Sequence, residues 1–293
     1  MSAVLPPAAL RAVAPPGYLR AIARRLRHDY VTLSFGAILV LTLLAACCAP
    51  LVAHYDPYAT GLLGRLKPPG WQGHLLGTDD LGRDMFARLL YGARMSLAMG
   101  VAPVALALAI GGSLGVLAGF YGGALNMAIM RTMDVFYAFP SVLLAVAISG
   151  TIGGGVASGL LALTLVFIPS LCRIAETATS QVRALDFVEA AQATGASSLS
   201  VIVAHVLGNV LPALFVFASS LISVSVLLAA GLSFLGLGVQ PPTPDWGQML
   251  AGLRQAIYLQ PLVCALPGLA ICIVSFSFNM VSDGLRHAMD IRT

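Results

Sequence analysis

The chain has 293 residues, of which 58% are hydrophobic and 10% are charged, and its formal net charge is +4. Soluble domains carry about 25% charged residues, so this composition excludes an ordinary soluble domain and predicts an integral membrane protein. The sequence holds no basic cluster with interleaved aromatic residues, which argues against nucleic-acid binding.

Six apolar segments predict an all-α membrane protein with six transmembrane helices, because each segment is close to the ~20 residues that cross a bilayer. They cover residues 31–53, 95–121, 133–149, 156–174, 210–232 and 262–281. The first segment exceeds the roughly 7–15 residues of a signal-peptide apolar region, so we expect it to be a retained membrane helix. The third is the shortest, and we expect its helix to extend back toward Leu125.

The distribution of basic residues predicts an N-in, C-in topology. With the N-terminus inside, more basic residues fall on the cytoplasmic side than outside, and aspartates offset many of the outer ones. The inner set is Arg11, Arg20, Arg24, Arg25, Arg27, Arg131, Arg173, Arg183, Arg286 and Arg292. The outer set is Arg65, Lys67, Arg83, Arg88, Arg94 and Arg254.

The first outer loop, residues 54–94, predicts an amphipathic helix at the outer membrane surface. Thr78 or Asp79 is the expected cap, and the helix is expected to run through Met85 into the second span. We interpret the charged residues around its start as paired or solvated, with a chemical role as the less favoured alternative. These residues are Asp79, Asp80, Arg83 and Asp84.

The second outer loop, between the fifth and sixth spans, begins with glycines and prolines and then carries a helical stripe of apolar residues. The stripe comprises Trp246, Met249, Leu250, Leu253 and Ile257. It predicts a helix that lies at the membrane interface with Trp246 as its anchor.

The spans carry a glycine stripe and almost no charge. Gly111, Gly115 and Gly119 are spaced four residues apart, which predicts close packing against another helix. Asp134 lies three residues from Arg131, so an ion pair between them accounts for it. Proton-driven transporters usually carry a carboxylate or histidine in mid-membrane, and its absence from this sequence argues against that class.

A few polar side chains remain in the last two spans. They either line a neutral conduit or hydrogen-bond between helices, and the second interpretation is favoured. The candidates for lining a translocation path are Ser219, Ser220, Ser223, Ser275 and Asn279.

Residues 186–209 form a water-facing stretch between the fourth and fifth spans, which the predicted topology places in the cytoplasm. Glu189 is expected near the start of a short helix, Gly195 in a turn, and Ser197 or Ser198 as the cap of a second helix. The second helix is expected to place four apolar residues on one face. They are Leu199, Ile202, Val203 and Val206. We call residues 186–209 the knuckle.

Motifs for catalysis, cofactors and metals are missing from the sequence. Lys67 is the one lysine and is followed by Pro68, so a phosphate-binding GxxxxGK[ST] loop cannot form. The five histidines are widely separated and give no local metal site. If the protein performs energised transport, a partner must supply the energy.

The knuckle resembles the EAA motif of importer permeases of ATP-binding-cassette (ABC) systems. Its shared positions are Glu189, Ala190, Ala191, Gly195 and Leu207, with His205 and Gly208 at positions where the pattern has Ile and Pro. Four further stretches resemble the second-subunit type of the dipeptide/oligopeptide/nickel branch. They are LGTDDLGRDMFARLLYGARMSL from Leu76, RTMDVFYAFPSVLLAVAI from Arg131, LSFLGLGVQPPTPDWGQML from Leu232 and NMVSDGLRHAMD from Asn279.

This resemblance implies the type I ABC importer permease fold in the bacterial inner membrane and a heteromeric complex. The implied partners are a homologous second permease, two cytoplasmic ATPase subunits and a periplasmic or extracellular substrate-binding protein. The knuckle would be the coupling helix, contacting an ATPase through Glu189 to Gly195 together with Ser197, His205 and Leu207. The chain itself would be neither an enzyme nor a cofactor protein, since ATP and magnesium would bind the ATPase subunits.

The resulting division of the chain has five parts. Residues 1–30 are the cytoplasmic N-terminal segment, 31–53 the first transmembrane helix, and 54–94 the periplasmic loop. Residues 95–285 form a five-helix permease core with the coupling loop at 175–209, and 286–293 are the cytoplasmic tail.

Peptide import is the favoured function under this resemblance. Import of nickel or metal chelates, glutathione or opine-like solutes by the same architecture is the alternative. A secondary transporter or channel without an ATPase, and an intramembrane enzyme, are alternatives of other classes. The first of these would keep transporting when ATP is depleted.

Overall fold

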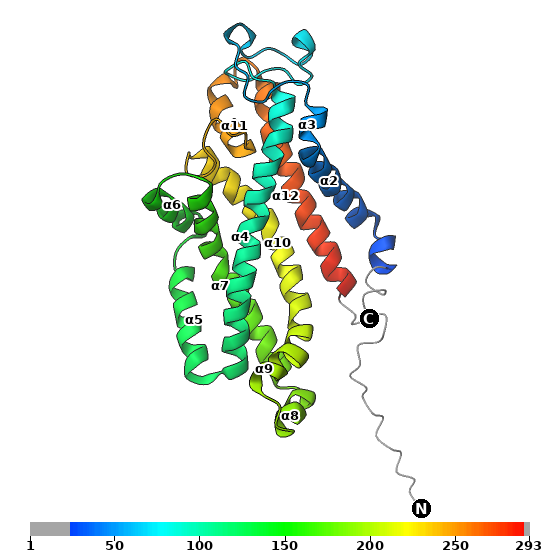
Figure 1. Ribbon diagram of the computed structural model, residues 1–293, viewed down its shortest axis with the longest axis vertical. Coiled ribbons are helices and arrows are strands. Elements are labelled where there is room, and N and C mark those ends of the chain that lie inside the picture. Colours follow the sequence, from blue (N-terminus) through cyan, green and yellow to red (C-terminus); the bar gives the residue numbers. More distant parts are fainter. Residues whose placement is uncertain (1–23, 290–293) are drawn as a thin grey trace, which may run out of the picture.

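The computed structural model describes residues 24–289, so Arg11, Arg20 and Arg292 of the predicted inner set lie outside the described residues, as do most of the expected N-terminal segment and part of the tail. Long helices run along one axis of an elongated molecule (Figure 1). The α-helices are α2 Tyr30–Cys47, α3 Ala49–Val52, α4 Met85–Tyr121, α5 Gly123–Tyr137, α6 Ser141–Ile152, α7 Val156–Arg183, α8 Asp186–Ala193, α9 Ser198–Val201, α10 Leu207–Phe234, α11 Trp246–Leu253 and α12 Pro261–Met289. A π-helix at Ile202–Val206 joins α9 to α10, and 3-10 turns lie at Leu62–Gly64, Trp71–Gly73 and Arg254–Ala256.

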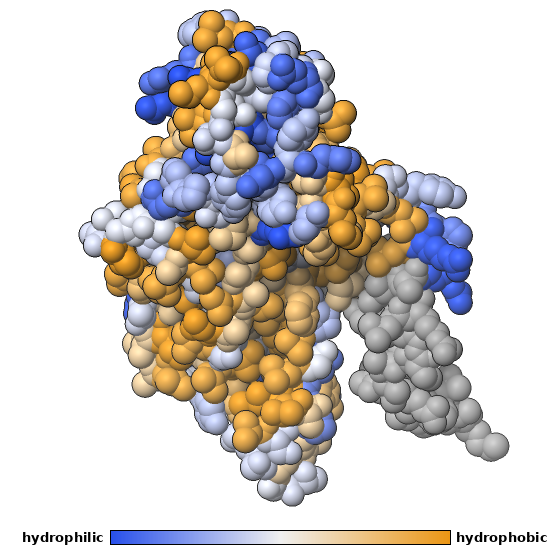
Figure 2. Space-filling model, turned by 45° about the horizontal axis from the view of Figure 1, so that its top comes forward, coloured by the Kyte–Doolittle hydropathy of each residue, from blue (hydrophilic) through white to orange (hydrophobic). Residues whose placement is uncertain are grey.

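The described residues contain five helices that are long and apolar enough to cross a membrane, or six spans if the bent pair α5 and α6 counts as one. On the face seen in Figure 2, apolar residues dominate the middle of the molecule, and polar residues gather above them and at the lower tip. The helical fold with five to six spans agrees with the predicted class. The N-terminal end of α2 and the C-terminal end of α12 point toward the end of the molecule where the knuckle helices α8 and α9 lie (Figure 1).

The third expected span is not the single helix over 133–149 that the sequence predicted. The chain bends by 87° between α5 and α6, and Pro140 forms the N-cap of α6 with φ −55° and ψ 127°. Proline has no N–H to donate and disfavours helical conformation at the residue before it, so Pro140 favours a break at this point. The expected extension toward Leu125 is present, because α5 begins at Gly123.

Helices α4 and α7 make the most extensive contact between two helices of the described residues, and the glycine stripe lies between them. A Cβ built on Gly111 or Gly119 would come within 2.6 Å of a carbonyl oxygen of α7, and one built on Gly115 would overlap the carbonyl oxygen of Cys172. Backbones approach this closely only where a side chain is absent. The predicted packing role of the stripe is confirmed.

The outer loop folds into a cap over one end of the bundle. The paired interpretation of its charged residues is confirmed: Asp79, Arg83 and Asp84 are buried and paired, and Asp80 is partly buried. As predicted, the helix runs through Met85 into the second span, and it forms the first part of α4, which is one continuous helix of 37 residues. Its cap is Asp84, not Thr78 or Asp79, since the Asp84 carboxylate accepts a hydrogen bond of 2.7 Å from the amide of Ala87. The prediction was therefore wrong about the cap and the start of the helix, but not about its continuation into the second span.

Asp79 is the centre of the buried charge network in this cap. Its Oδ2 lies 2.6 Å from Nε of Arg83 and 3.4 Å from Nε of Arg88. The Arg88 guanidinium also donates to the carbonyl of Pro57 at 3.1 Å and to the Gln248 amide oxygen at 3.3 Å. The network thus fastens the outer loop to α4 and α11, because a buried charge is stable only when paired and hydrogen-bonded.

Trp246 of α11 is packed inside the protein and is not the exposed membrane anchor that the stripe predicted. Trp246 is only 3% exposed, and its Nε1 donates a 3.0 Å hydrogen bond to the carbonyl of Leu89 in α4. The indole ring lies against Gly92, where a Cβ would meet it at 3.2 Å. Ile257, at the far end of the stripe, is exposed and lies beyond α11. The sequence pattern does not tell whether a tryptophan near a membrane boundary is an anchor or a core residue. Here the absence of a side chain at Gly92 leaves room for the indole ring against α4.

Candidate functional site

The knuckle has the predicted helix–turn–helix form and lies at the end of the bundle (Figure 1). Helix α8 carries Glu189 in its first turn, and Gly195 adopts φ +84°, the left-handed region that glycine enters freely. Ser197 caps α9 by accepting a 3.3 Å hydrogen bond from the amide of Ser200. The chain therefore turns sharply between two short helices without a side-chain clash at the turn.

The apolar face of the second helix differs from the predicted one. Ile202 and Val206 are buried as expected, but Leu199 is 71% exposed and Val203 is 59% exposed. The cause is the π-helix over Ile202–Val206, because each of its turns takes one more residue than an α-turn. The 3.6-residue period that grouped the four residues is therefore interrupted, and Leu199 and Val203 face outward while Ile202 and Val206 are buried.

The buried side of the knuckle forms one apolar cluster with α4 and α7. The knuckle and the start of α10 contribute Val188, Val201, Ile202, Val206, Val210 and Leu214, and the long helices contribute Val116, Phe120 and Ala175. Since close-packed side chains resist relative displacement, a force applied to the knuckle is carried into these helices.

The predicted coupling residues all lie on this knuckle. Glu189, Ala190, Gly195 and Ser197 are exposed, whereas Ala191 is partly buried. His205 and Leu207, also partly buried, lie at the junction with α10. A Cβ added at Gly208 would meet nothing within 4 Å, so the glycine at this position, where the motif has proline, is not required by packing.

The polar candidates in the last spans do not gather into one site. Ser219 donates to the carbonyl of Val216 at 2.7 Å and lies 3.0 Å from the hydroxyl of Ser282 in α12, a contact between helices. Ser220 donates to the carbonyl of Phe217 in its own helix. Ser223 donates to the carbonyl of Ser220 at 2.8 Å within the same helix. Ser275 is buried and Asn279 is exposed. For Ser219 the geometry matches the interhelical interpretation.

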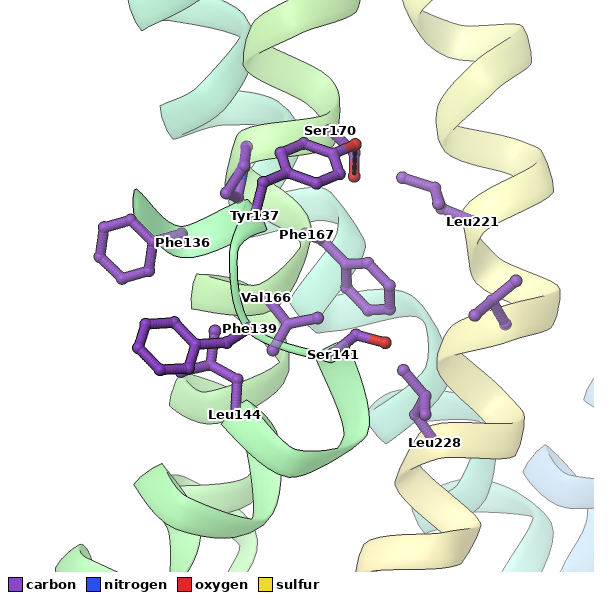
Figure 3. A pocket seen from close by; sticks show the side chains of 12 residues that line it. Phe136, Tyr137, Phe139, Ser141, Leu144, Val166, Phe167, Ser170, Leu221 and Leu228 are labelled. Carbon is purple, nitrogen blue, oxygen red and sulfur yellow. Dashed lines mark hydrogen bonds between the residues drawn. The ribbon is translucent and has the colours of Figure 1, made fainter. Parts of the chain in front are cut away.

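A cavity of about 290 Å³ lies where α5 bends into α6, between these helices, α7 and α10. We call it the bend pocket. In Figure 3, Ser141 and Phe167 project toward α10, from which Leu221 and Leu228 reach back. The Tyr137 and Ser170 hydroxyls lie 2.9 Å apart at its wall. Its other lining residues are Phe136, Phe139, Leu144, Val166, Pro169 and Val224.

An ion pair between α5 and α7 lies next to this pocket. Arg173 Nη2 is 2.7 Å from Asp134 Oδ1, whereas Arg131 Nη1, the partner expected from sequence spacing, is 3.7 Å from Oδ2. The Arg173 guanidinium also stands 4.9 Å from the ring centroid of Tyr137, a cation–π contact. The interhelical partner is thus the closer of the two.

Sequence reasoning missed the bend pocket entirely. Its local signal is the aromatic run from Phe136 to Phe139 ending at Pro140, which marks a break in an apolar segment. The contributions of α7 and α10 could not be found from spacing, because they are distant in sequence. Within residues 24–289, no group of three or more His, Cys, Asp or Glu side chains is arranged to hold a metal ion.

Comparisons with known proteins identify the family. The model of the binding-protein-dependent transport system inner membrane component matches residues 111–293. The glutathione transport system permease protein GsiD of Pectobacterium atrosepticum is 38% identical over 91% of this chain and 89% of its own length. The di/tripeptide transport system permease protein DppC of Pseudomonas aeruginosa is 42% identical over 88% and 87%, and the probable D,D-dipeptide permease DdpC of Escherichia coli is 40% identical over 90% and 89%.

A solved structure supports the same fold. A chain of the MetNI methionine ABC transporter, in an inward-facing conformation, matches with a TM-score of 0.54 and 20% identity, covering 69% of this chain and 97% of that one. Membership of this family implies an ATPase and a binding protein as partners. The chain therefore belongs to the binding-protein-dependent transport system inner membrane components, as a multi-pass permease of an ABC transporter that carries out transport rather than catalysis.

Proposed function

We propose that this permease imports short peptides, with one ATPase subunit seated on the knuckle. The observation that carries the proposal is the knuckle itself: exposed Glu189 and Gly195 beside the exposed Leu199 and Val203, on a base packed into α4 and α7. The printed names of the relatives, which include dipeptide, di/tripeptide and glutathione systems, support a peptide-like substrate.

The knuckle is suited to transmit an external movement. Its outer side presents two large apolar side chains to water, which is a feature of protein contact sites when they lie together. Its inner side belongs to the same packed cluster as α4 and α7. Closure of the ATPases, with ATP and magnesium bound to them, would displace the knuckle and tilt these helices as rigid bodies.

A homologous second permease would complete the translocation path. Helix α2 packs on α12, and only 11% of its residues are buried inside the protein. Such exposure is expected for a helix that faces lipid. The charged pair Asp134 and Arg173 is half exposed on another part of the molecule, around α5 and α7. Charge is disfavoured against lipid, so this part of the surface is the one we assign to the second permease and the path between them.

The test is uptake by the complete system in cells that lack their own peptide importers. The wild type should import labelled dialanine, and uptake should stop when ATP is depleted. Retained uptake without ATP would favour a secondary transporter or channel. Import of glutathione but not of dialanine would show that glutathione, not a short peptide, is the substrate.

The knuckle is tested in the same cells with Gly195→Pro, Gly195→Asn and Glu189→Lys. Proline fixes φ near −65° and cannot adopt the +84° found here, so Gly195→Pro should abolish uptake. Asparagine tolerates the left-handed region, so Gly195→Asn should retain most of it. Glu189→Lys should abolish uptake while the protein still inserts. Normal uptake by the proline and lysine variants would refute the assigned role.

A further inference from the structure

The bend pocket has the lining of a site for an apolar side chain. Nine of its twelve lining residues are apolar, namely Phe136, Phe139, Leu144, Val166, Phe167, Pro169, Leu221, Val224 and Leu228. The other three are the hydroxyl residues Tyr137, Ser141 and Ser170, and none of the twelve is charged. Ligand sites commonly combine such an apolar wall with a few hydrogen-bonding groups.

The pocket lies beside a half-exposed ion pair, which lipid would not accommodate. Arg173 is 48% exposed and Asp134 is 46% exposed, and Arg173 contacts the ring of Tyr137 in the pocket wall. Arg173 lies ten residues before the end of α7, which is about 15 Å along the helix. The ion pair therefore lies at the cytoplasmic end of the predicted span 156–174, where charged side chains face water, protein or an aqueous cavity rather than lipid tails.

The dimensions of the pocket limit its occupant. Its volume of about 290 Å³ lies just below the roughly 300–1,000 Å³ typical of small-molecule sites. It therefore admits one side chain with its adjoining backbone rather than a long peptide. The Tyr137 and Ser170 hydroxyls can donate and accept, so they can hydrogen-bond the amide groups that adjoin such a side chain.

We propose that the bend pocket receives an apolar side chain of a peptide in transit, so that this permease itself favours apolar dipeptides over glutathione. The inference rests on the proposed import function and adds a specificity site to it. Glutathione carries two carboxylates and no large apolar side chain. A carboxylate placed against this lining would lose its hydration without gaining a cationic partner, because Arg173 is already paired with Asp134.

The experiment uses the complete transporter, reconstituted in vesicles with its ATPases, binding protein and enclosed ATP. Val224 lines the pocket and is exposed, so Val224→Trp fills the pocket from α10. Leu227 is exposed on the same helix outside the lining, so Leu227→Trp introduces the same side chain without filling it. Uptake of alanylphenylalanine, dialanine and glutathione is measured at saturating binding protein.

The expected result is a loss of selectivity for the larger side chain. Val224→Trp should lower alanylphenylalanine uptake by about tenfold or more relative to dialanine, the scale on which apolar pockets discriminate. Leu227→Trp should leave this ratio unchanged. If Val224→Trp prevents stimulated ATP hydrolysis, Val224→Ala replaces it. This variant enlarges the pocket and should raise uptake of alanyltryptophan relative to dialanine.

The outcomes separate the two proposals. If the wild type imports peptides but the pocket variants leave the uptake ratios unchanged, the pocket role is overturned and peptide import stands. Import of glutathione as fast as alanylphenylalanine by the wild type also overturns the pocket's role. If the wild type imports no peptide, the proposed function fails and the pocket assignment fails with it.

Discussion

Arg173 of α7 donates a 2.7 Å hydrogen bond to the carboxylate of Asp134 in α5, and both side chains are about half exposed. If they face an aqueous path, their attraction is screened by water and salt. A double-mutant cycle with Arg173→Gln and Asp134→Asn should give a coupling energy of about 0.2–1 kcal/mol in unfolding experiments. The coupling should shrink as salt is added.

The control for this cycle is Arg131, whose contact to Asp134 is longer, at 3.7 Å, and more exposed. Arg131→Gln should couple more weakly to Asp134→Asn than Arg173→Gln does. A coupling of several kcal/mol that is insensitive to salt would contradict a water-accessible face.

The glycine stripe predicts a sharp difference between neighbouring positions of α4. Gly115→Ala should destabilise the detergent-solubilised protein by about 1–3 kcal/mol, because the added methyl group overlaps the Cys172 carbonyl. Gly112→Ala is the matched control, since its Cβ would make ordinary contacts no closer than 3.7 Å. Thermal unfolding measures both, and equal shifts for the two variants would show that α4 and α7 are not packed this closely.

Asp245 predicts a pH-dependent contribution to stability. Burial raises the pKa of this carboxyl group, although hydrogen bonds from Ser96 and from the Gln248 and Gly247 amides oppose the shift. The folded state then binds the proton more tightly than the unfolded chain, whose pKa is about 3.9. The contribution is therefore most favourable below that value and is lost as the pH rises through the folded pKa.

Asp245→Asn removes this titration while keeping an oxygen for the cap of α11. The stability of the wild type relative to Asp245→Asn should fall as the pH rises, measured as the difference between their unfolding temperatures. Asp245→Ala loses the cap as well and should be less stable than Asp245→Asn by about 0.5–2 kcal/mol. A pH-independent difference between wild type and Asp245→Asn would mean that Asp245 is not desolvated.

The sequence was most informative where local chemistry decides the structure. The apolar runs located the spans, Gly195 and Ser197 marked the turn and cap of the knuckle, and the spacing of Gly111, Gly115 and Gly119 predicted a packed face. Each of these signals depends on a few adjacent residues or on a regular repeat, so it is readable without knowing the fold.

Contacts between distant segments could not be predicted in this way. The burial of Trp246 depends on Gly92, and the burial of Asp79 depends on Arg88 held by Gln248 of α11. Leu199 and Val203 are exposed beside a π-helix, whose wider turn the 3.6-residue period does not anticipate. In each case the pattern within one segment predicts which residues share a helix face. Packing against other segments, or a change of helix type, then decides which of them are buried.

The central claim is that an ATPase subunit holds the knuckle, and site-specific photo-crosslinking tests it most directly. A photoreactive residue replaces Leu199, which is exposed on the knuckle, and separately Leu43, which is exposed on α2. In membranes containing the whole transporter, the probe at position 199 should crosslink to the ATPase subunit and the probe at 43 should not. No crosslink from 199, or equal crosslinks from both positions, would contradict the account.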